Sequence, residues 1–211
     1  MAVNKDWTGN SKSIHVILSA SNHSDTERET NDYYATSPRA VEMLLEKEEF
    51  SKNIWEPACG GNHITKVLRK NGYNVKTSDI IDRIGDGSVE IIDFLKIPSG
   101  LGNKKYDMDI ITNPPYKYAQ EFVEKSLDII EPGRKVAMYL KIQFLETAKR
   151  YELFKKHPPK YIYVSVRRLG CAKNGEWSNP VNETDAGAAC YCWYIWEKGF
   201  KGEPIIRWFN Y

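Results

Sequence analysis

The stretch from Asn53 to Ile80, NIWEPACGGNHITKVLRKNGYNVKTSDI, decides the fold class. Its apolar start at 53–58 predicts a strand, and the amphipathic segment 63–72 predicts a helix that ends at Gly72. A second strand follows over 73–80. Strand, helix and strand in this order are typical of a sheet whose strands run parallel, with the helix packed on one face.

The rest of the chain continues this alternation. A helix with Ser37 at its N-cap and Pro38 at its first position precedes the stretch. The further expected elements are strands over 89–95, 106–113, 135–140, 160–168 and 188–199, and helices over 118–130 and 144–156. No helix separates the last two strands, so they predict an antiparallel hairpin. We therefore expect an α/β fold, mostly parallel, with helices on both faces and this hairpin at its C-terminal end.

Two polar segments flank or interrupt this pattern. Residues 1–30 carry one apolar cluster, IHVIL, and are interpreted as a mobile arm. Residues 31–211 are expected to form a single domain. Within it, the Gly- and Asn-rich segment 169–188 is long for a compact domain, which favours a functional loop.

Charge and hydropathy narrow the classes of partner. The 211 residues carry a formal net charge of +2, and no apolar run approaches the roughly 20 residues of a membrane-spanning helix. The polar start does not resemble a signal peptide, so we expect a cytoplasmic protein without a membrane partner. Basic residues concentrate between Arg134 and Lys173. This concentration favours a surface for nucleic-acid phosphates, although solvated helix faces would give the same pattern.

The four cysteines form no CxxC pair and no recognisable disulfide framework. A zinc site built from Cys171, Cys190, Cys192 and His157 is conceivable. Reduced, partly buried thiols are the favoured interpretation, with Cys59 among them, and no metal is expected.

The turn after the first strand of the opening stretch is built from small residues. Ala58, Gly60 and Gly61 would let a nucleoside cofactor approach the backbone without side-chain collision. Asp79 ends the next strand, at about the 20-residue spacing of an acid that holds ribose hydroxyls. The alternative for Asp79 is an ordinary turn residue at a strand end.

A second acid follows in the segment IIDFL. Asp93 would accept a hydrogen bond from the exocyclic amine of an adenine ring, with Phe94 or Ile80 packing on the ring face. Taken alone, Phe94 is more typical of a core residue.

The stretch DIITNPPYKYAQEF, 109–122, places a stiff corner at the end of a buried strand. An exocyclic amine on a nucleobase is a poor nucleophile, because its lone pair is delocalised into the ring. Asn113 would accept one amine hydrogen, and Pro114, held extended by Pro115, would offer its carbonyl to the other. Tyr116 would stack on an extruded base. The alternative is a Pro-Pro pair that only ends a strand.

These motifs together resemble the S-adenosylmethionine-dependent DNA adenine-N6 methyltransferases, particularly the small phage or prophage type. WEPACGG resembles their cofactor motif, DFL their adenine-binding motif, and NPPY their catalytic motif. YYATSPRAVEMLL resembles the segment that precedes the cofactor motif. The resemblance covers residues 32–200 and implies a Rossmann-like class I methyltransferase with a seven-stranded sheet.

The resemblance also implies roles for individual residues. The catalytic corner would be Asn113, Pro114, Pro115 and Tyr116. The S-adenosylmethionine pocket would be lined by Thr36, Glu56, Pro57, Ala58, Cys59, Gly60, Asp79, Ile80, Asp93, Phe94 and Asn113, with Ser37 as a further candidate beside Thr36.

Family members that recognise a long sequence carry a separate recognition domain, for which this chain has no room. The basic helix at 143–157 and the loop at 169–188 would then contact duplex DNA, and we expect short or relaxed sequence recognition, or help from a partner protein. Candidate DNA contacts are Tyr116, Lys117, Arg167, Arg168, Lys173 and Trp177, with a hydrophobic anchor as an equal alternative for Trp177. We expect a monomer or weak dimer, in the host cytoplasm if the chain is phage-encoded.

Three other functions share parts of this pattern. NPPY also occurs in enzymes that methylate RNA bases or protein glutamine amides, and a non-catalytic remnant would keep the fold and bind nucleic acid. The turn EPACGG and the segment YYATSP favour DNA over RNA or protein. Intact Asn113, Asp79 and Asp93 argue against a remnant.

Overall fold

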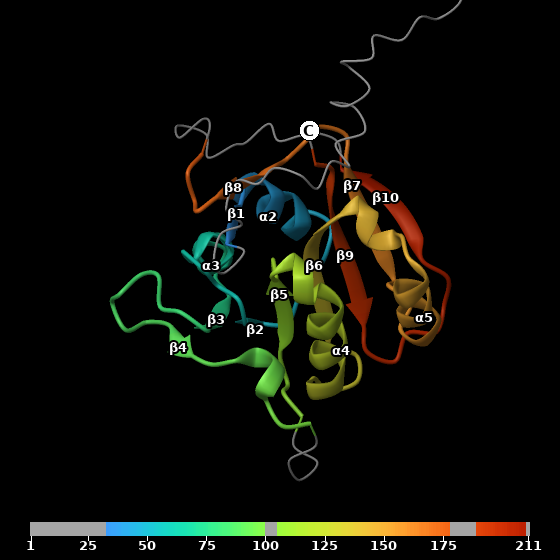
Figure 1. Cartoon of the computed structure of the whole chain (residues 1–211), viewed down its shortest axis with the longest axis horizontal. Coiled ribbons are helices and arrows are strands. Elements are labelled where there is room, and N and C mark those ends of the chain that lie inside the picture. The colour runs from blue at the N-terminus through green and yellow to red at the C-terminus, as the bar shows by residue number, and fades with distance from the viewer. Residues whose placement is uncertain (1–32, 100–104, 178–188, 210–211) are drawn as a thin grey trace, which may run out of the picture. The chain divides into compact units, whose positions relative to one another are not determined.

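Figure 1 shows the computed structural model, which describes residues 33–99, 105–177 and 189–209. The interpreted arm at 1–30 and the part of the interpreted loop at 178–188 lie outside the described residues.

The strands are β1 (Tyr34–Thr36), β2 (Asn53–Glu56), β3 (Asn74–Asp79), β4 (Glu90–Ile91), β5 (Asp109–Thr112), β6 (Lys135–Lys141), β7 (Tyr161–Ser165), β8 (Cys171–Lys173), β9 (Tyr191–Glu197) and β10 (Ile205–Phe209). The α-helices are α2 (Pro38–Leu45), α3 (His63–Lys70), α4 (Ala119–Ile129) and α5 (Ala148–Lys156). Short 3₁₀ helices are η1 (Phe94–Lys96), η3 (Tyr116–Tyr118) and η4 (Ile142–Leu145).

One main sheet carries the fold of the described residues, in the order β10-β7-β9-β6-β5-β2-β3-β4. Neighbouring strands run parallel except at β9, which lies antiparallel between β6 and β7. The expected antiparallel hairpin is therefore confirmed. The sheet has eight strands rather than the expected seven, because β10 pairs in parallel with the outer edge of β7.

The middle of the sheet is buried on both faces, as alternating side chains along β6 and β9 show. Val136, Met138 and Leu140 contribute to the core on one face, and Ala137 and Tyr139 to the core on the other. Strand β9 divides its aromatic residues in the same way. Side chains along a strand point alternately to opposite faces, so a doubly covered strand reads as a continuous apolar run.

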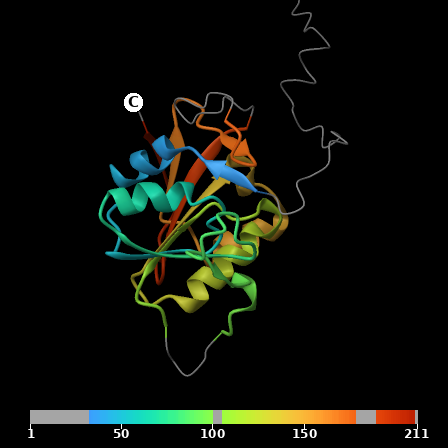
Figure 2. The same ribbon diagram turned by 90° about the vertical axis from the view of Figure 1, so that its left-hand side faces the viewer.

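Helices cover both faces of the sheet. Apolar residues of α2 and α3 pack into the core on one face, and residues of α4 and α5 into the core on the other. Figure 2 shows α2 and α3 on the side of the sheet opposite to α4. No helix among the described residues has the length and apolar character to cross a membrane.

A separate two-stranded sheet, called here the closing ribbon, joins the start of the described chain to the segment that follows β7. Strand β1 pairs antiparallel with β8, so that Thr36 lies opposite Cys171 and Tyr34 opposite Lys173. Ala35, 2% exposed, lies opposite Ala172, 0% exposed, and this buried pair anchors the ribbon. Residues 171–173 of the loop expected at 169–188 therefore form a strand.

The start of α2 differs from its expected capping. Pro38 occupies the first turn, but Ser37 makes no side-chain cap hydrogen bond. Its hydroxyl is buried and has no hydrogen-bond partner among the described residues. Buried hydroxyls are usually hydrogen-bonded, so helix capping does not explain the serine at this position.

Asp109 fastens the start of β5 to its surroundings. Its side chain is 3% exposed and accepts hydrogen bonds from the backbone N–H of Ser51, at 2.6 Å, and of Lys135, at 2.7 Å. We predict that Asp109→Ala lowers the free energy of unfolding by about 2–4 kcal/mol, because two N–H groups lose their acceptor.

Urea denaturation of the two proteins measures this effect. Asp107→Ala is the matched control, because Asp107 pairs with Arg134 at an exposed site and its loss should cost under about 1 kcal/mol. Equal losses for the two variants would contradict the role assigned to Asp109.

Candidate active site

The ends of β2, β3 and β5 meet at one edge of the sheet. These strands are neighbours and run parallel, so their last residues, Glu56, Asp79 and Thr112, lie along the same carboxyl edge. In open α/β sheets this edge is where ligands bind. All three side chains are buried there, which concentrates polar groups at a place where water is scarce.

The turn after β2, residues 57–62, is called here the glycine turn and depends on Gly60. Its φ is +52°, and a Cβ there would lie 2.3 Å from Cε2 of Tyr33. Glycine is therefore required for the backbone conformation and for the close approach of the tyrosine ring. The Gly60 N–H donates to Oδ2 of Asp79 at 2.9 Å, and the Gly61 N–H donates to the Tyr33 hydroxyl at 3.1 Å.

Glu56 is a buried acid at this turn. Its carboxylate accepts a hydrogen bond from the Thr65 hydroxyl of α3. Burial, with a smaller contribution from the nearby charge of Asp79, raises the pKa of Glu56 to about 8. A cationic group bound beside Glu56 would stabilise its ionised form and lower that pKa.

The acid at the end of β3 holds the turn in place. In addition to the Gly60 bond, Oδ1 of Asp79 accepts from the backbone N–H of Ile81 at 3.2 Å. Each carboxylate oxygen keeps a second lone pair for a ligand hydroxyl. The next side chain, Ile80, is 53% exposed, which leaves an apolar surface beside the carboxylate.

The remaining residues proposed for the cofactor pocket divide between surface and core. Asp93 caps η1 by accepting from the Leu95 N–H at 3.2 Å and pairs with the exposed Lys96 at 3.0 Å. Phe94 is 2% exposed and packs on Trp55 in the core, so only its backbone can contribute to a pocket.

Pro57, Ala58 and Cys59 were also proposed for the pocket, but their side chains serve the packing of the turn. Pro57 is buried, and Ala58 is half-buried against the core. Burial raises the pKa of the Cys59 thiol to about 12, which keeps it protonated and unreactive at neutral pH.

Residues 113–116, called here the Asn113 corner, follow β5. The Asn113 amide donates through Nδ2 to the backbone oxygen of Tyr34 at 2.8 Å and contacts the Sγ of Cys171 at 3.7 Å. Its Oδ1 is buried and has no hydrogen-bond partner among the described residues. The amide is thus oriented by its donor end, and its acceptor end is unsatisfied. Pro114 is buried and Pro115 is half-buried beside it.

Tyr116 belongs to an aromatic cluster. Its ring stacks on Tyr34 with centroids 5.7 Å apart and lies 5.9 Å from the ring of Tyr191, and Nζ of Lys141 is 5.1 Å from its centroid. Burial raises the pKa of Tyr116 well above its ordinary value, so its hydroxyl stays protonated.

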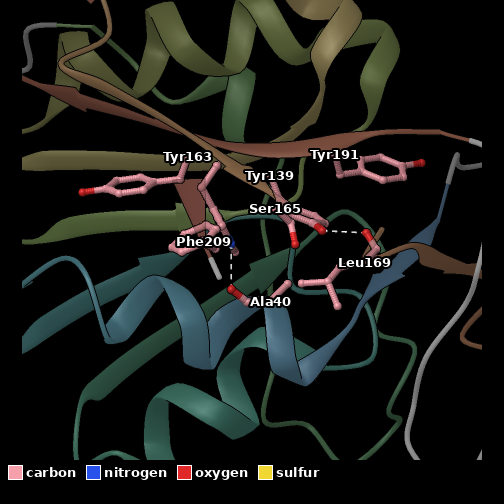
Figure 3. A pocket seen from close by; sticks show the side chains of 8 residues that line it. Ala40, Tyr139, Tyr163, Ser165, Leu169, Tyr191 and Phe209 are labelled. Carbon is pink, nitrogen blue, oxygen red and sulfur yellow. Dashed lines mark hydrogen bonds between the residues drawn. The ribbon is translucent and has the colours of Figure 1, made fainter. Parts of the chain in front are cut away.

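Behind this cluster, Tyr139, Tyr191 and Leu169 help to line a narrow gap (Figure 3). The Tyr139 hydroxyl donates to the Leu169 backbone oxygen at 2.7 Å across it. The gap is too narrow to hold a water molecule, so it is no ligand pocket. The candidate site lies at the carboxyl edge, between the glycine turn and the Asn113 corner.

The closing ribbon contacts both parts of this site. Tyr33, just before β1, lies on the glycine turn, and Tyr34 lies on the Asn113 corner. Thr36 is 2% exposed, and its hydroxyl has no hydrogen-bond partner among the described residues. Sequence reasoning identified Thr36 but missed Tyr33, Tyr34 and Cys171. The tyrosine pair inside YYATSP was the signal for the first two, whereas nothing in the sequence indicated that Cys171 pairs beside Thr36.

The residues proposed to contact DNA occupy two places. Lys117 is exposed at the corner, next to Tyr116, and Arg167, Arg168 and Lys173 are exposed between β7 and the end of β8. Trp177 is half-buried and packs edge-on against His63 at the start of α3, with centroids 5.8 Å apart. Of its two interpretations, this position favours the hydrophobic anchor.

The described cysteines form no disulfide, and no group of three or more metal-ligating side chains occurs within the described ranges. Strand pairing puts Cys171 beside Thr36, while Cys192 lies within β9.

Comparisons with known proteins identify the fold. No protein-family model matches the sequence, and no curated protein matches it. A proposed class I S-adenosylmethionine-dependent methyltransferase from Listeria monocytogenes has a similar structure, with a TM-score of 0.55 and 17% identity over 93% of this chain and 71% of its own. A proposed O-methyltransferase from Agrobacterium tumefaciens gives 0.55 and 12% over 82% and 85%.

The M protein of the type I restriction enzyme EcoKI gives a TM-score of 0.52 and 11% identity over 82% of this chain and 45% of its own. At these identities the likeness is one of fold. The chain has the Rossmann-like class I methyltransferase fold, as the sequence predicted.

The contact between Gly60 and Tyr33 gives a prediction about stability. We expect Gly60→Ala to lower the free energy of unfolding by more than Gly72→Ala. Both glycines have positive φ, which costs alanine about 1–2 kcal/mol, but at Gly72 a Cβ meets only Nζ of Lys52, at 3.5 Å. In a double-mutant cycle, Gly60→Ala in the Tyr33→Ala background should cost no more stability than Gly72→Ala. A larger cost that persists in that background would contradict the contact.

The raised pKa of Glu56 gives a prediction about pH. The folded protein keeps this proton up to about pH 8, whereas the unfolded chain loses it near pH 4.5, the ordinary pKa of a glutamate side chain. This group therefore stabilises the fold fully below pH 4.5 and loses its contribution as pH rises to about 8, by at most about 1.4 kcal/mol per pH unit. Glu56→Gln, measured by denaturation from pH 5 to 8, should remove this dependence; an unchanged slope would refute it.

Proposed function

We propose that this protein transfers a methyl group from S-adenosylmethionine to the exocyclic N6 amine of adenine in DNA. The observation that carries the proposal is the buried Oδ1 of Asn113, which has no hydrogen-bond partner among the described residues. A buried acceptor left unsatisfied costs free energy, so its persistence at a ligand-binding edge points to a hydrogen-bond donor supplied by the substrate.

The geometry of the corner supports an amine as that donor. The Nδ2 bond to the Tyr34 carbonyl fixes the amide so that Oδ1 is the end left for a ligand. Pro114 has no N–H to donate, and its carbonyl belongs to the residue directly after Asn113. Two acceptors on a stiff backbone match the two hydrogens of one exocyclic amine, and they can weaken its conjugation with the ring.

The residues of the glycine turn fit the cofactor. Asp79 keeps lone pairs for two ribose hydroxyls, and the exposed Ile80 offers a surface for an adenine ring. The unpartnered hydroxyls of Thr36 and Ser37 and the buried carboxyl of Glu56 suit the polar methionine end. When bound, S-adenosylmethionine supplies an electrophilic methyl group on its sulfonium.

In the proposed reaction, the Asn113 and Pro114 oxygens hold the amine while its lone pair attacks the methyl carbon. The nitrogen–carbon bond forms as the sulfur–carbon bond breaks, which leaves S-adenosylhomocysteine. The amine then gives up one proton to solvent. No protein group changes its charge in this sequence, so the corner acts through position and hydrogen bonding.

Tyr116 would stack on the extruded base, with a rearrangement. Tyr34 already lies against the Tyr116 ring. An adenine can take that place only after the Tyr34 side chain turns away, while the Tyr34 backbone keeps its bond to Asn113. The rearrangement costs aromatic contacts that stacking on the base replaces.

Two features support DNA as the substrate. Lys117 and Lys141 carry positive charge at the mouth of the corner, where a base extruded from a duplex would bring its flanking phosphates. The fold is also shared with the M protein of the restriction enzyme EcoKI. The charges at Arg167, Arg168 and Lys173 would extend this surface.

The direct test incubates the protein with labelled S-adenosylmethionine and unmethylated duplex DNA, RNA or a protein extract in parallel. Label in N6-methyladenine of the DNA is the expected result. Label confined to RNA or protein would replace the proposed substrate. Cofactor binding without any transfer would favour a remnant that has kept the fold.

Asn113 gives the sharpest prediction for activity. Asn113→Ala should lower kcat about 100-fold or more, because the amine loses a preorganised acceptor, while S-adenosylmethionine affinity changes little. Asn113→Asp keeps an acceptor but loses the donor to Tyr34, so its kcat should lie between those of the wild type and Asn113→Ala. Methyl transfer and cofactor titration measure these effects. Gln120→Ala is the control on α4, because the Gln120 side chain donates a hydrogen bond to Glu124 of the same helix.

A further inference from the structure

We propose that Cys171 is a positioning residue for methyl transfer, because its sulfur holds both Asn113 and Tyr116 in their working orientations. The inference rests on the proposed function and assigns to the closing ribbon a part in that reaction. It starts from a sulfur atom that touches two residues of the corner.

The first contact involves the amide of Asn113. Nδ2 carries two hydrogens; one is directed to the Tyr34 carbonyl at 2.8 Å, and the Cys171 sulfur lies 3.7 Å from the same nitrogen. Thiol sulfur is a weak acceptor with a long reach, and 3.7 Å is within it. The donor end of the amide is therefore held from both strands of the ribbon, which leaves Oδ1 as the end available to a substrate.

The second contact involves the stacking ring. The Tyr116 hydroxyl lies 3.7 Å from the same sulfur and donates to it. Tyr191 also contacts this hydroxyl. Cys171 thus links the acceptor of the amine to the ring expected to stack on the base, so that the two keep a common position when Tyr34 turns away.

Backbone pairing sets the position of this sulfur. Cys171 lies directly opposite Thr36, and opposed residues of an antiparallel pair point to the same face. That face also carries Tyr34, which stacks on Tyr116. Thr36 is 2% exposed, and its hydroxyl lacks a partner among the described residues, so a second unsatisfied group adjoins the sulfur.

The ribbon itself is held firmly. Ala172 is fully buried, and the backbone N–H of Asn174 donates to the Tyr33 oxygen at 3.2 Å, just beyond the paired residues. The other cysteines differ in place: Cys59 and Cys192 are buried, and Cys190 packs against the core under α4 and α5. Cys190 is therefore the matched control, a half-buried thiol that packs against the core on the opposite face of the sheet from Cys171.

The test compares Cys171→Ala, Cys171→Ser and Cys190→Ala in the full chain. Cys171→Ala should lower kcat about 10-fold, through loss of alignment, with the KM for S-adenosylmethionine and the Tm unchanged. Cys171→Ser should recover most of kcat, because a hydroxyl accepts the same hydrogen bonds. Cys190→Ala should match the wild type. A wild-type kcat for Cys171→Ala, or a loss that serine does not recover, would overturn the inference.

A second measurement separates this inference from the proposed function. The side-chain amide signals of Asn113, assigned through their absence in Asn113→Ala, should shift in the nitrogen–proton NMR spectrum of Cys171→Ala and stay in place in Cys190→Ala. If the wild type methylates no substrate, the proposed function fails. These signals alone then decide whether Cys171 contacts Asn113. Unshifted signals in Cys171→Ala would refute it.

Discussion

The hydrogen bond from Nδ2 of Asn113 to the backbone oxygen of Tyr34 is the interaction on which the candidate site depends. An amide side chain has a donor end and an acceptor end, and it can present either to a ligand until one is engaged. Engaging the donor makes the acceptor available. Because the partner is a backbone oxygen, the arrangement does not require the Tyr34 side chain to stay where it is.

The same short segment also controls the other half of the site. Tyr33 lies on the glycine turn, where its ring excludes any side chain at Gly60 and its hydroxyl accepts from Gly61. Two neighbouring tyrosines therefore contact the turn proposed for the cofactor and the corner proposed for the amine. Pairing of β1 with β8 holds this segment, so the order of both halves is tied to one small ribbon. A buried carboxyl, Glu56, adds a group whose charge would respond to a bound cation.

Periodicity and turn residues predicted much of the fold, and tertiary packing decided the exceptions. The βαβ stretch, the buried central strands and the antiparallel hairpin follow from apolar runs, glycine turns and the missing helix before β9. The eighth strand was not predicted, because β10 pairs only at the sheet edge and most of it is exposed. Phe94 packs against Trp55, and Trp177 packs against His63. No local sequence pattern encodes these contacts.

By itself, the sequence determined the fold class and the residue types at the carboxyl edge, because the succession of strands and helices along the chain and the chemistry of the turns are local properties. It predicted that Asn113 is an acceptor on a stiff corner. Only the tertiary structure decided which end of that amide is left for a ligand, since this depends on Tyr34 and on Cys171, residues far away in the chain. Pairing between such distant strands is set by the packing of the whole domain, and the orientation of a side chain follows from that pairing.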